Sequence, residues 1–299
     1  NPFLMKTITL NIDNKKLILD LFEFLSDKPN HGFKDFHKNK NFFFEEIIKI
    51  ISDKKYKILI SSVDKKIKNY FLIKNEDSLK RSIIMTHDVR KISEIIHEIK
   101  KITHSNKIEI AIRDSSDINP DKFSFIKLSK IYEFMKIKII SNKKIAYKKN
   151  NDFKVCGIDE NKNIEGLVDI QNDCFSDHYG YEINSTKDFI EEINSLKLTN
   201  IKSFFNISKN KSGRWIGYTW TQKNLSNNQS KLSMCGVKKQ FRNKGLAKEL
   251  IITAINELIE SNCEEILLEV DYENIPAKKI YEEIGFYTYD RLGWYELLV

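Results

Sequence analysis

The spacing of apolar residues along the chain follows two periods, which predict helices and strands in alternation. Apolar positions recur every three to four residues in some segments, as in amphipathic helices, and every second residue in others, as in half-buried strands. In the first half, the pattern predicts strands at 6–12, 56–62, 67–74, 80–86, 107–112 and 137–147, and helices at 14–26, 42–52, 88–103 and 121–135. In the second half, it predicts strands at 153–158, 201–208, 213–222, 231–237, 264–270 and 286–298, and helices at 163–175, 185–194, 245–261 and 275–284.

Each half therefore has the predicted order β-α-α-β-β-β-α-β-α-β. Three consecutive strands joined by short turns indicate an antiparallel meander, and the later strand–helix–strand unit indicates a parallel crossover. The sequence predicts an α/β protein with two domains, each a mixed central sheet flanked by helices.

Two short matches between the halves suggest an internal duplication. Asn11–Asp13 precedes a predicted helix as Gly157–Asp159 does, at an offset of 146 residues. The tetrapeptide Lys130–Glu133 recurs as Lys279–Glu282, at an offset of 149 residues. The polar stretch 147–152 suits a linker. We therefore predict two domains, at 1–150 and 151–299.

Charge separates the two halves. The chain carries a formal net charge of +8, but residues 1–150 hold 32 basic and 19 acidic side chains, a net +13, and the remainder is a net −5. Interspersed lysines usually form a solvated face, and no basic–aromatic RNA-binding pattern occurs. Nucleic acid is thus an unfavoured partner.

The placement of cysteines and the hydropathy of the chain indicate in which cell compartment the protein is expected. The four cysteines are dispersed through the second half without a Cys-x-x-Cys or metal-type spacing, so neither a disulfide scaffold nor a metal site is expected. No apolar run of about 18 residues occurs, and the N-terminus lacks the order of a signal peptide. We expect a cytoplasmic protein that does not insert into membranes.

The segment Val237–Ala247 joins a predicted strand to a predicted helix. A loop at this place presents unpaired backbone N–H groups, and the helix dipole adds partial positive charge. Gly245 permits close approach of the backbone, Ala247 is small, and Arg242 and Lys244 add full charges. This arrangement suits a pyrophosphate group, although an ordinary strand–turn–helix would look similar.

The residues that follow carry a family resemblance. Arg-x-x-Gly-x-Ala at 242–247 is followed by a strand, by Asn274-x-x-Ala277, by Tyr281 four positions later, and by Gly285-Phe286. This order resembles the GCN5-related N-acetyltransferases, the GNAT superfamily, over residues 151–299. The repeated plan extends the resemblance in fold to tandem GNAT proteins such as mycothiol synthase.

The resemblance implies an acyltransferase that uses acetyl-CoA as cosubstrate and no metal. It places the cosubstrate between splayed strands near 231–237 and 264–270. It implies that backbone groups of two strand residues pair with the pantetheine arm, that the loop cradles the pyrophosphate, and that an asparagine contacts the CoA arm. The implied cofactor-binding residues are Cys235, Val237, Arg242, Asn243, Lys244, Gly245, Leu246, Ala247 and Asn274.

Two catalytic residues are implied in the same way. Tyr281 would be the general acid that protonates the leaving thiolate, although a packed helix aromatic is the alternative. Glu269, twelve residues earlier, resembles the partner of this tyrosine in ribosomal-protein N-terminal acetyltransferases, and would be the base. A surface or strand-pairing glutamate is its alternative, and Asp271 and Glu273 are weaker candidates for the base.

The acceptor site is predicted where the two early helices of the second domain meet. Asp177, His178 and Tyr179 belong to an Asp-His-Tyr-Gly stretch that resembles the Asp-His-Trp-Gly of tandem GNAT proteins. His178 titrates near neutral pH and could bind or deprotonate an acceptor, or simply form hydrogen bonds at a helix end.

The first half departs from the motif. Thr86–Glu94 contains no glycine, so the loop is too bulky and too short for a bound phosphate. We predict a degenerate first domain beside a catalytic second domain that acetylates a primary amine of a small molecule. A protein N-terminal acetyltransferase and a non-catalytic acyl-CoA or nucleic-acid-binding module remain alternatives. The oligomeric state cannot be read from the sequence.

Overall fold

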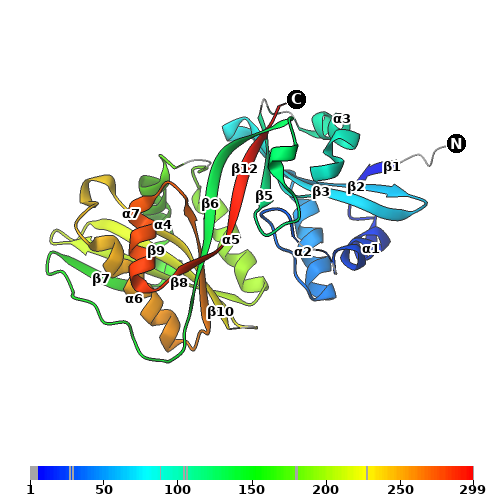
Figure 1. The fold of residues 1–299 in the computed structure, drawn as a ribbon. Helices are drawn as coiled ribbons and strands as arrows, with labels where there is room; N and C mark the ends of the chain where they lie inside the picture. The colour runs from blue at the N-terminus through cyan, green and yellow to red at the C-terminus, as the bar shows by residue number, and fades with distance from the viewer. Residues whose placement is uncertain are drawn as a thin grey trace. The chain divides into compact units, whose positions relative to one another are not determined.

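The computed structural model describes residues 6–26, 28, 30–87, 89–103, 105, 107–178, 181–226 and 228–298 (Figure 1). The chain divides into two compact units. Unit 1 comprises residues 1–133, 271–273 and 290–299, and unit 2 comprises residues 134–270 and 274–289. The fold is mixed α/β, as predicted. The domain boundary at residue 150, which is inferred from the internal duplication, stays a prediction.

Unit 1 begins with a sheet in the order β1-β2-β3-β4-β5 and continues with β12 and β6. Its elements are β1 (Lys6–Thr9), α1 (Lys15–Leu25), α2 (Lys40–Ser52), β2 (Tyr56–Val63), β3 (Lys66–Glu76), β4 (Arg81–His87), α3 (Ile92–Ile102), β5 (Lys107–Arg113) and the first part of β6 (Ile126–Lys138). The meander β2-β3-β4 is antiparallel and β4 pairs with β5 in parallel, as predicted.

Unit 2 has a sheet in the order β6-β11-β10-β9-β8-β7, and β6 and β12 contribute residues to both units. Its elements are β7 (Phe153–Ile158), α4 (Glu160–Phe175), α5 (Thr186–Leu198), β8 (Ile201–Asn210), β9 (Trp215–Asn224), β10 (Gln229–Val237), α6 (Leu246–Glu260), β11 (Glu265–Asp271), α7 (Ile275–Ile284) and the start of β12 (Tyr287–Leu297). The meander β8-β9-β10 is antiparallel, and β10 pairs with β11 in parallel.

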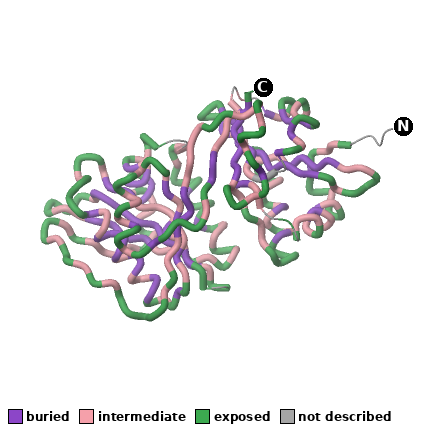
Figure 2. The backbone as a smooth tube through the Cα atoms, viewed as in Figure 1, coloured by how far each residue is buried: buried purple, intermediate pink, exposed green. Residues whose placement is uncertain are grey.

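The cores form where alternate residues of each strand point toward a helix. Figure 2 shows many buried residues along the strands of both units. In unit 2, Phe205 and Trp220 pack under α4 and α5, whereas Ile266 and Leu268 pack against α6 and α7. In unit 1, α1 and α2 cover one face of β2 and β3, and α3 covers the other. Each unit is therefore a sheet between two helical layers.

Two predicted elements are wrong. Residues 121–135 are not a helix, because most of this segment lies in β6, and residues 139–147 are not a strand. The tetrapeptide Lys130–Glu133 is therefore extended, whereas its copy Lys279–Glu282 is helical. Helix α7 begins with Pro276 in its first turn and with Asn274, whose side chain accepts the Ala277 N–H at 3.3 Å. Strand β6 instead lies between β12 and β11, which can satisfy its backbone on both edges.

The stretch that follows β6 runs along α6 without regular structure. The side chain of Asn256 accepts the Ile145 N–H and donates to the Ile145 carbonyl, at 2.8 and 3.0 Å. Further along, the Glu249 carboxylate accepts the Asn150 N–H at 3.0 Å. Side chains of α6 therefore satisfy this backbone in place of a neighbouring strand. None of the helices in the described part of the chain has the length and hydrophobicity needed to cross a membrane.

A β-bulge interrupts both sheets at corresponding places. In unit 2, the register of β10 against β9 shifts between Leu232 and Met234, and the parallel pairing of β10 with β11 ends at Lys231. In unit 1, the register of β4 against β3 shifts across Met85, and the pairing of β4 with β5 ends at Ile84. Beyond each bulge, the parallel strands separate and leave backbone groups without a strand partner.

Unit 1 fills this separation with its own chain. The Met85 carbonyl accepts the N–H groups of Phe33 and Lys34, at 2.7 and 3.1 Å. On the other strand, the Arg113 N–H donates to the His31 carbonyl at 2.8 Å, and its Nε donates to the Gly32 carbonyl at 2.8 Å. The segment 31–34 thus occupies the space between the ends of β4 and β5.

Candidate functional site

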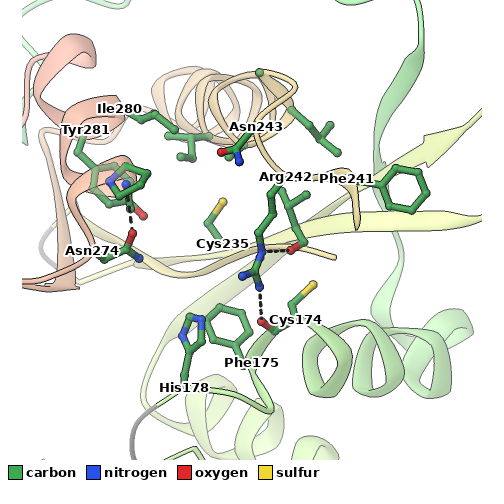
Figure 3. Close-up of a pocket in the computed structure, with 18 residues that line it drawn as sticks. Cys174, Phe175, His178, Cys235, Phe241, Arg242, Asn243, Asn274, Ile280 and Tyr281 are labelled. Carbon is green, nitrogen blue, oxygen red and sulfur yellow. Dashed lines mark hydrogen bonds between the residues drawn. The ribbon is translucent and has the colours of Figure 1, made fainter. Parts of the chain in front are cut away.

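In unit 2, the separation of the strands opens into a cavity of about 310 Å³. Its lining comes from the end of α4, the end of β10, the loop before α6, and α6 and α7. Figure 3 shows Tyr281 and Asn274 on one side of this cavity, Phe175 and His178 on the other, and Cys235 and Arg242 between them. The lining residues are Cys174, Phe175, His178, Cys235, Gly236, Val237, Phe241, Arg242, Asn243, Gly245, Leu246, Ala247, Ile251, Asn274, Pro276, Ala277, Ile280 and Tyr281.

The end of β10 presents backbone groups toward this cavity. The Lys238 N–H donates to the Ile216 carbonyl in β9, so the preceding carbonyl, of Val237, points the other way. Because alternate residues of a strand direct their backbone groups to the same side, Cys235 faces the open edge as well. The predicted backbone contacts from Cys235 and Val237 are therefore geometrically available, except that the Val237 carbonyl already accepts the Arg242 Nε at 2.9 Å.

The loop before α6 has left-handed backbone at two positions next to the N-terminus of the helix. Asn243 and Gly245 adopt φ of 61° and 79°, and Gly245 is the N-cap of α6 without a side-chain hydrogen bond to the cap. The first turn therefore keeps N–H groups without intrahelical partners at the edge of the cavity. The positive φ explains why a glycine stands at this position.

The two predicted cationic side chains of the loop differ in position. The Arg242 guanidinium lies at the cavity, where it donates to the carbonyls of Val237 and Cys174, at 2.9 and 3.2 Å. It thereby links β10 to the end of α4. Lys244 is exposed and does not line the cavity, and its Nζ lies 5.6 Å from the centre of the Phe241 ring.

Tyr281 belongs to the core of unit 2, and its side chain also lines the cavity. The residue is only 8% exposed, and its ring packs edge-on against Phe286 with centroids 5.8 Å apart. Burial, and to a smaller extent the nearby Cys235, raises the pKa of the phenol far above its usual range. The hydroxyl therefore keeps its proton at every physiological pH.

Burial also keeps the two cavity thiols neutral. It raises the pKa of both Cys174 and Cys235 to about 12, although Arg242 opposes the shift at Cys174. A thiol that ionises only at such pH is a poor nucleophile. Neither cysteine is suited to carry an acyl group.

Glu269 is placed apart from Tyr281. Its neighbours Leu268 and Val270 pack in the same cluster as Tyr281, so Glu269, between them on β11, points to the opposite face of the sheet. Its carboxylate pairs with the Lys231 Nζ at 2.6 Å and does not line the cavity. Asp271 and Glu273, the weaker candidates, both pair with Lys130, at 3.0 and 2.5 Å.

The predicted acceptor residues follow α4. His178 lines the cavity, its N–H donates to the Phe175 carbonyl at 2.8 Å, and its ring contacts the Phe175 ring edge-on at 4.7 Å. Asp177 instead pairs with Lys239 at 2.9 Å outside the lining, and this ion pair lowers the pKa of the Asp177 carboxyl. Tyr179 lies outside the described residues.

Gly236 is a cavity residue that the sequence reading missed. A Cβ at this position would lie 2.6 Å from the Cys174 Cβ and 2.8 Å from Cε2 of Phe175, so α4 packs directly against the backbone of β10. A glycine inside a predicted strand is the signal that could have revealed this close approach. Within the described residues, no group of three or more His, Cys, Asp or Glu side chains is arranged to hold a metal.

We expect Gly236→Ala to destabilise unit 2 by about 1–3 kcal/mol, because the new methyl group forces α4 away from β10. Gly157→Ala is the matched control in β7, where the nearest atom to a new Cβ lies 3.7 Å away, and should change stability by less than about 0.5 kcal/mol. Urea unfolding measures both variants. Equal unfolding free energies for the two would contradict the close packing at Gly236.

Comparisons with known proteins agree with the motif and the fold. The profile of the acetyltransferase (GNAT) family matches residues 164–286. An N-alpha-acetyltransferase MAK3 of Arabidopsis thaliana is 39% identical over 66 residues, which are 22% of this chain and 35% of that protein. A mycothiol acetyltransferase of Saccharomonospora viridis is 28% identical over 91 residues, 28% of this chain and 30% of that protein. The match thus spans about a third of these relatives.

A solved structure shares the fold of nearly the whole chain. A tandem GNAT protein from the clavulanic acid biosynthesis pathway superposes with a TM-score of 0.72 at 10% identity, covering 98% of both chains. At this identity, the likeness concerns the fold alone. Residues 164–286 therefore belong to the acetyltransferase (GNAT) family, and nearly the whole chain has the fold of a tandem GNAT protein.

Proposed function

We propose that unit 2 transfers an acetyl group from acetyl-CoA to a primary amine of a small molecule. The observation that carries the proposal is the cavity where β10 and β11 separate, which joins an open strand edge, a helix N-terminus and a protonated tyrosine in one place. The amine attacks the thioester of the cosubstrate, and the CoA thiolate is then expelled.

The residues of the cavity fit the parts of acetyl-CoA. The N–H groups at the start of α6 and the loop residues Arg242 to Ala247 suit the pyrophosphate. The open edge of β10 at Cys235 suits an amide-containing arm, because it offers backbone hydrogen-bonding groups as a neighbouring strand would. Asn274 caps α7 at the border of the cavity, where it could contact the same arm.

Tyr281 is the proton donor in this proposal. Attack of the amine on the thioester leads to expulsion of a thiolate, and a hydroxyl hydrogen bond to the sulfur stabilises the charge as it develops. A phenol is already protonated at neutral pH, and burial raises the pKa of Tyr281 further, so it stays a hydrogen-bond donor to higher pH.

His178 is the best-placed group to receive the proton of the amine. Among the described side chains of the cavity, the two thiols have strongly raised pKa values, and arginine does not deprotonate in proteins. An imidazole titrates near neutral pH, and His178 lines the cavity from the end of α4, across from Tyr281 on α7 (Figure 3). Glu269 remains the alternative base, although it needs release from Lys231 first.

A peptide N-terminus is the second candidate acceptor. The relative from Arabidopsis thaliana is named an N-alpha-acetyltransferase, and the spacing of Glu269 and Tyr281 resembles enzymes of that kind. The small-molecule amine is preferred here because Glu269 and Tyr281 point to opposite faces of the sheet. A purely acyl-CoA-binding role is disfavoured, because the cavity holds both a proton donor and a candidate base.

We expect Tyr281→Phe to lower kcat by about 100-fold while the affinity for acetyl-CoA changes less than about threefold, because the variant loses the proton donor but keeps the ring. In the native protein, kcat should show no decline below about pH 10 due to Tyr281, because its raised pKa delays ionisation. Release of CoA thiol measures both quantities. Tyr287→Phe, at an exposed tyrosine nearby, is the control. An unchanged kcat in Tyr281→Phe would remove this residue from the proposed role.

We expect one acetyl-CoA site per chain, because segment 31–34 occupies the corresponding space in unit 1. Gly245→Val should weaken binding at least about tenfold, because the αL backbone of the cradle is strained for any other residue. Gly213→Val is a matched control: both glycines have φ of 79° with open space around a new Cβ, but Gly213 lies in a hairpin turn away from the cavity. Calorimetry measures stoichiometry and affinity. Two sites of similar affinity, or equal binding by both variants, would contradict this assignment.

The acceptor class is tested by CoA release across primary amines, aminoglycoside-type and amino-sugar compounds, and short peptides with free N-termini. We expect turnover above the rate of hydrolysis with at least one small amine, and loss of that turnover in Tyr281→Phe. Turnover with peptides alone would instead support the N-terminal acetyltransferase. Binding of acetyl-CoA without turnover across the panel would argue against a transferase and for a binding module.

A further inference from the structure

Unit 1 contains a cavity of its own, of about 460 Å³, which shares no residue with the cavity of unit 2. It lies where the end of α1, the segment before α2, and the chain beyond β5 meet. The lining residues are Phe22, Leu25, Ser26, Lys28, Asn30, Lys34, Asp35, Phe36, His37, Lys38, Phe43, Tyr70, Arg113 and Ser115. The size is in the usual range of small-molecule sites.

Aromatic rings form the walls of this cavity. Phe43 and Tyr70 are 1% and 8% exposed, and Phe36 packs against both, with centroids 5.5 and 6.4 Å apart. Phe22 meets Phe43 edge-on at 5.2 Å. Phe22 and Phe36 are only half-buried and therefore present ring surface in the lining, backed by the buried rings of Phe43 and Tyr70, which favours a flat aromatic body over a flexible polar one.

Basic side chains outnumber acidic ones in the described lining. Lys28, Lys34, Lys38 and Arg113 line the cavity, and Asp35 is the single acidic residue in the described lining. Asp35 pairs with Arg113 at 2.8 Å, and Lys34 pairs with Glu46 from outside the lining.

Lys38 is exposed and makes no ion pair with any described residue. The described lining residues therefore have a formal positive charge, with four basic side chains against one acidic side chain. A cleft lined by one sign of charge concentrates ligands of the opposite sign.

The segment that forms the opening is held in place before any ligand arrives. The Asn30 side chain donates to the Lys34 carbonyl at 2.9 Å and to the Asp35 carboxylate at 2.6 Å, and it accepts the Gly32 N–H at 2.9 Å. The Glu46 carboxylate accepts the His37 N–H at 3.1 Å. A preformed site loses less conformational entropy on binding.

We propose that this cavity binds a small aromatic carboxylate, with its ring between the phenylalanines and its carboxylate at the basic opening. The aromatic residues favour a flat apolar body, and Lys38 favours the negative charge. The concave shape and limited volume favour a small molecule over a nucleic acid strand, which needs an extended basic groove. This inference does not depend on the function proposed for unit 2.

The test uses naphthoate as the probe and naphthamide, its neutral counterpart of nearly equal shape, as the matched control ligand. With the full chain at low salt, we expect naphthoate to bind one site with a dissociation constant of about a millimolar or tighter, and naphthamide at least about fivefold more weakly. Added salt should weaken naphthoate binding and leave naphthamide binding unchanged. Equal affinities for the two probes, or no binding of naphthoate, would overturn the proposal.

Charge-reversal variants locate the site. Lys38→Glu should weaken naphthoate binding about tenfold, because it replaces an attractive charge at the opening with a repulsive one. Lys16→Glu is the matched control, at an exposed residue of α1 outside the lining, and should keep the native affinity within about twofold. Both lysines are exposed, so neither change should prevent folding.

Two results would contradict the location. Equal effects of Lys38→Glu and Lys16→Glu would show that only the general positive charge of unit 1 attracts the probe. Displacement of naphthoate by acetyl-CoA in the native chain, together with native affinity in Lys38→Glu, would place the probe in the cavity of unit 2 instead. Retention of naphthoate in the presence of acetyl-CoA supports a separate site.

Discussion

Both units depend on the same interruption of the sheet, a β-bulge after which a parallel pair of strands stops hydrogen-bonding. The bulge lies between Leu232 and Met234 in β10 and at Met85 in β4. A strand that leaves its partner exposes backbone donors and acceptors, and these must find other partners or face a ligand or water. The two units differ in how each one meets this requirement.

Unit 1 supplies partners for these backbone groups from its own chain, whereas in unit 2 the strand edge faces a cavity. The backbone of residues 31–34 bonds to Met85 and Arg113, so the ends of β4 and β5 are satisfied within the unit. In unit 2, β10 keeps its open edge toward a cavity bordered by the N-terminus of α6. Lys34, at the end of the segment that closes the gap in unit 1, also lines that unit's separate, basic and aromatic cavity.

Burial determines the chemistry that the cavity of unit 2 can support. It raises the pKa of Tyr281 and of both cavity thiols, so the site offers neutral donors and no thiolate. The charge that borders the cavity is local, from Arg242 and the helix N-terminus, and does not reflect the net charge of either half. Four of the basic residues in the first half, in contrast, line the cavity of unit 1.

The sequence by itself determined the order of nearly all helices and strands, because periodicity and capping residues are local properties. It also indicated the family that matches residues 164–286, because Arg242, Gly245, Asn274 and Tyr281 follow one another at the spacing of the GNAT motif. Tertiary structure decided the rest. Lys130–Glu133 is a strand because two neighbouring strands satisfy its backbone, whereas its copy lies in the helix that Asn274 caps. The close packing at Gly236, the opposite orientation of Glu269, and the filling of unit 1 by residues 31–34 depend on contacts between segments far apart in the chain, which no local pattern records.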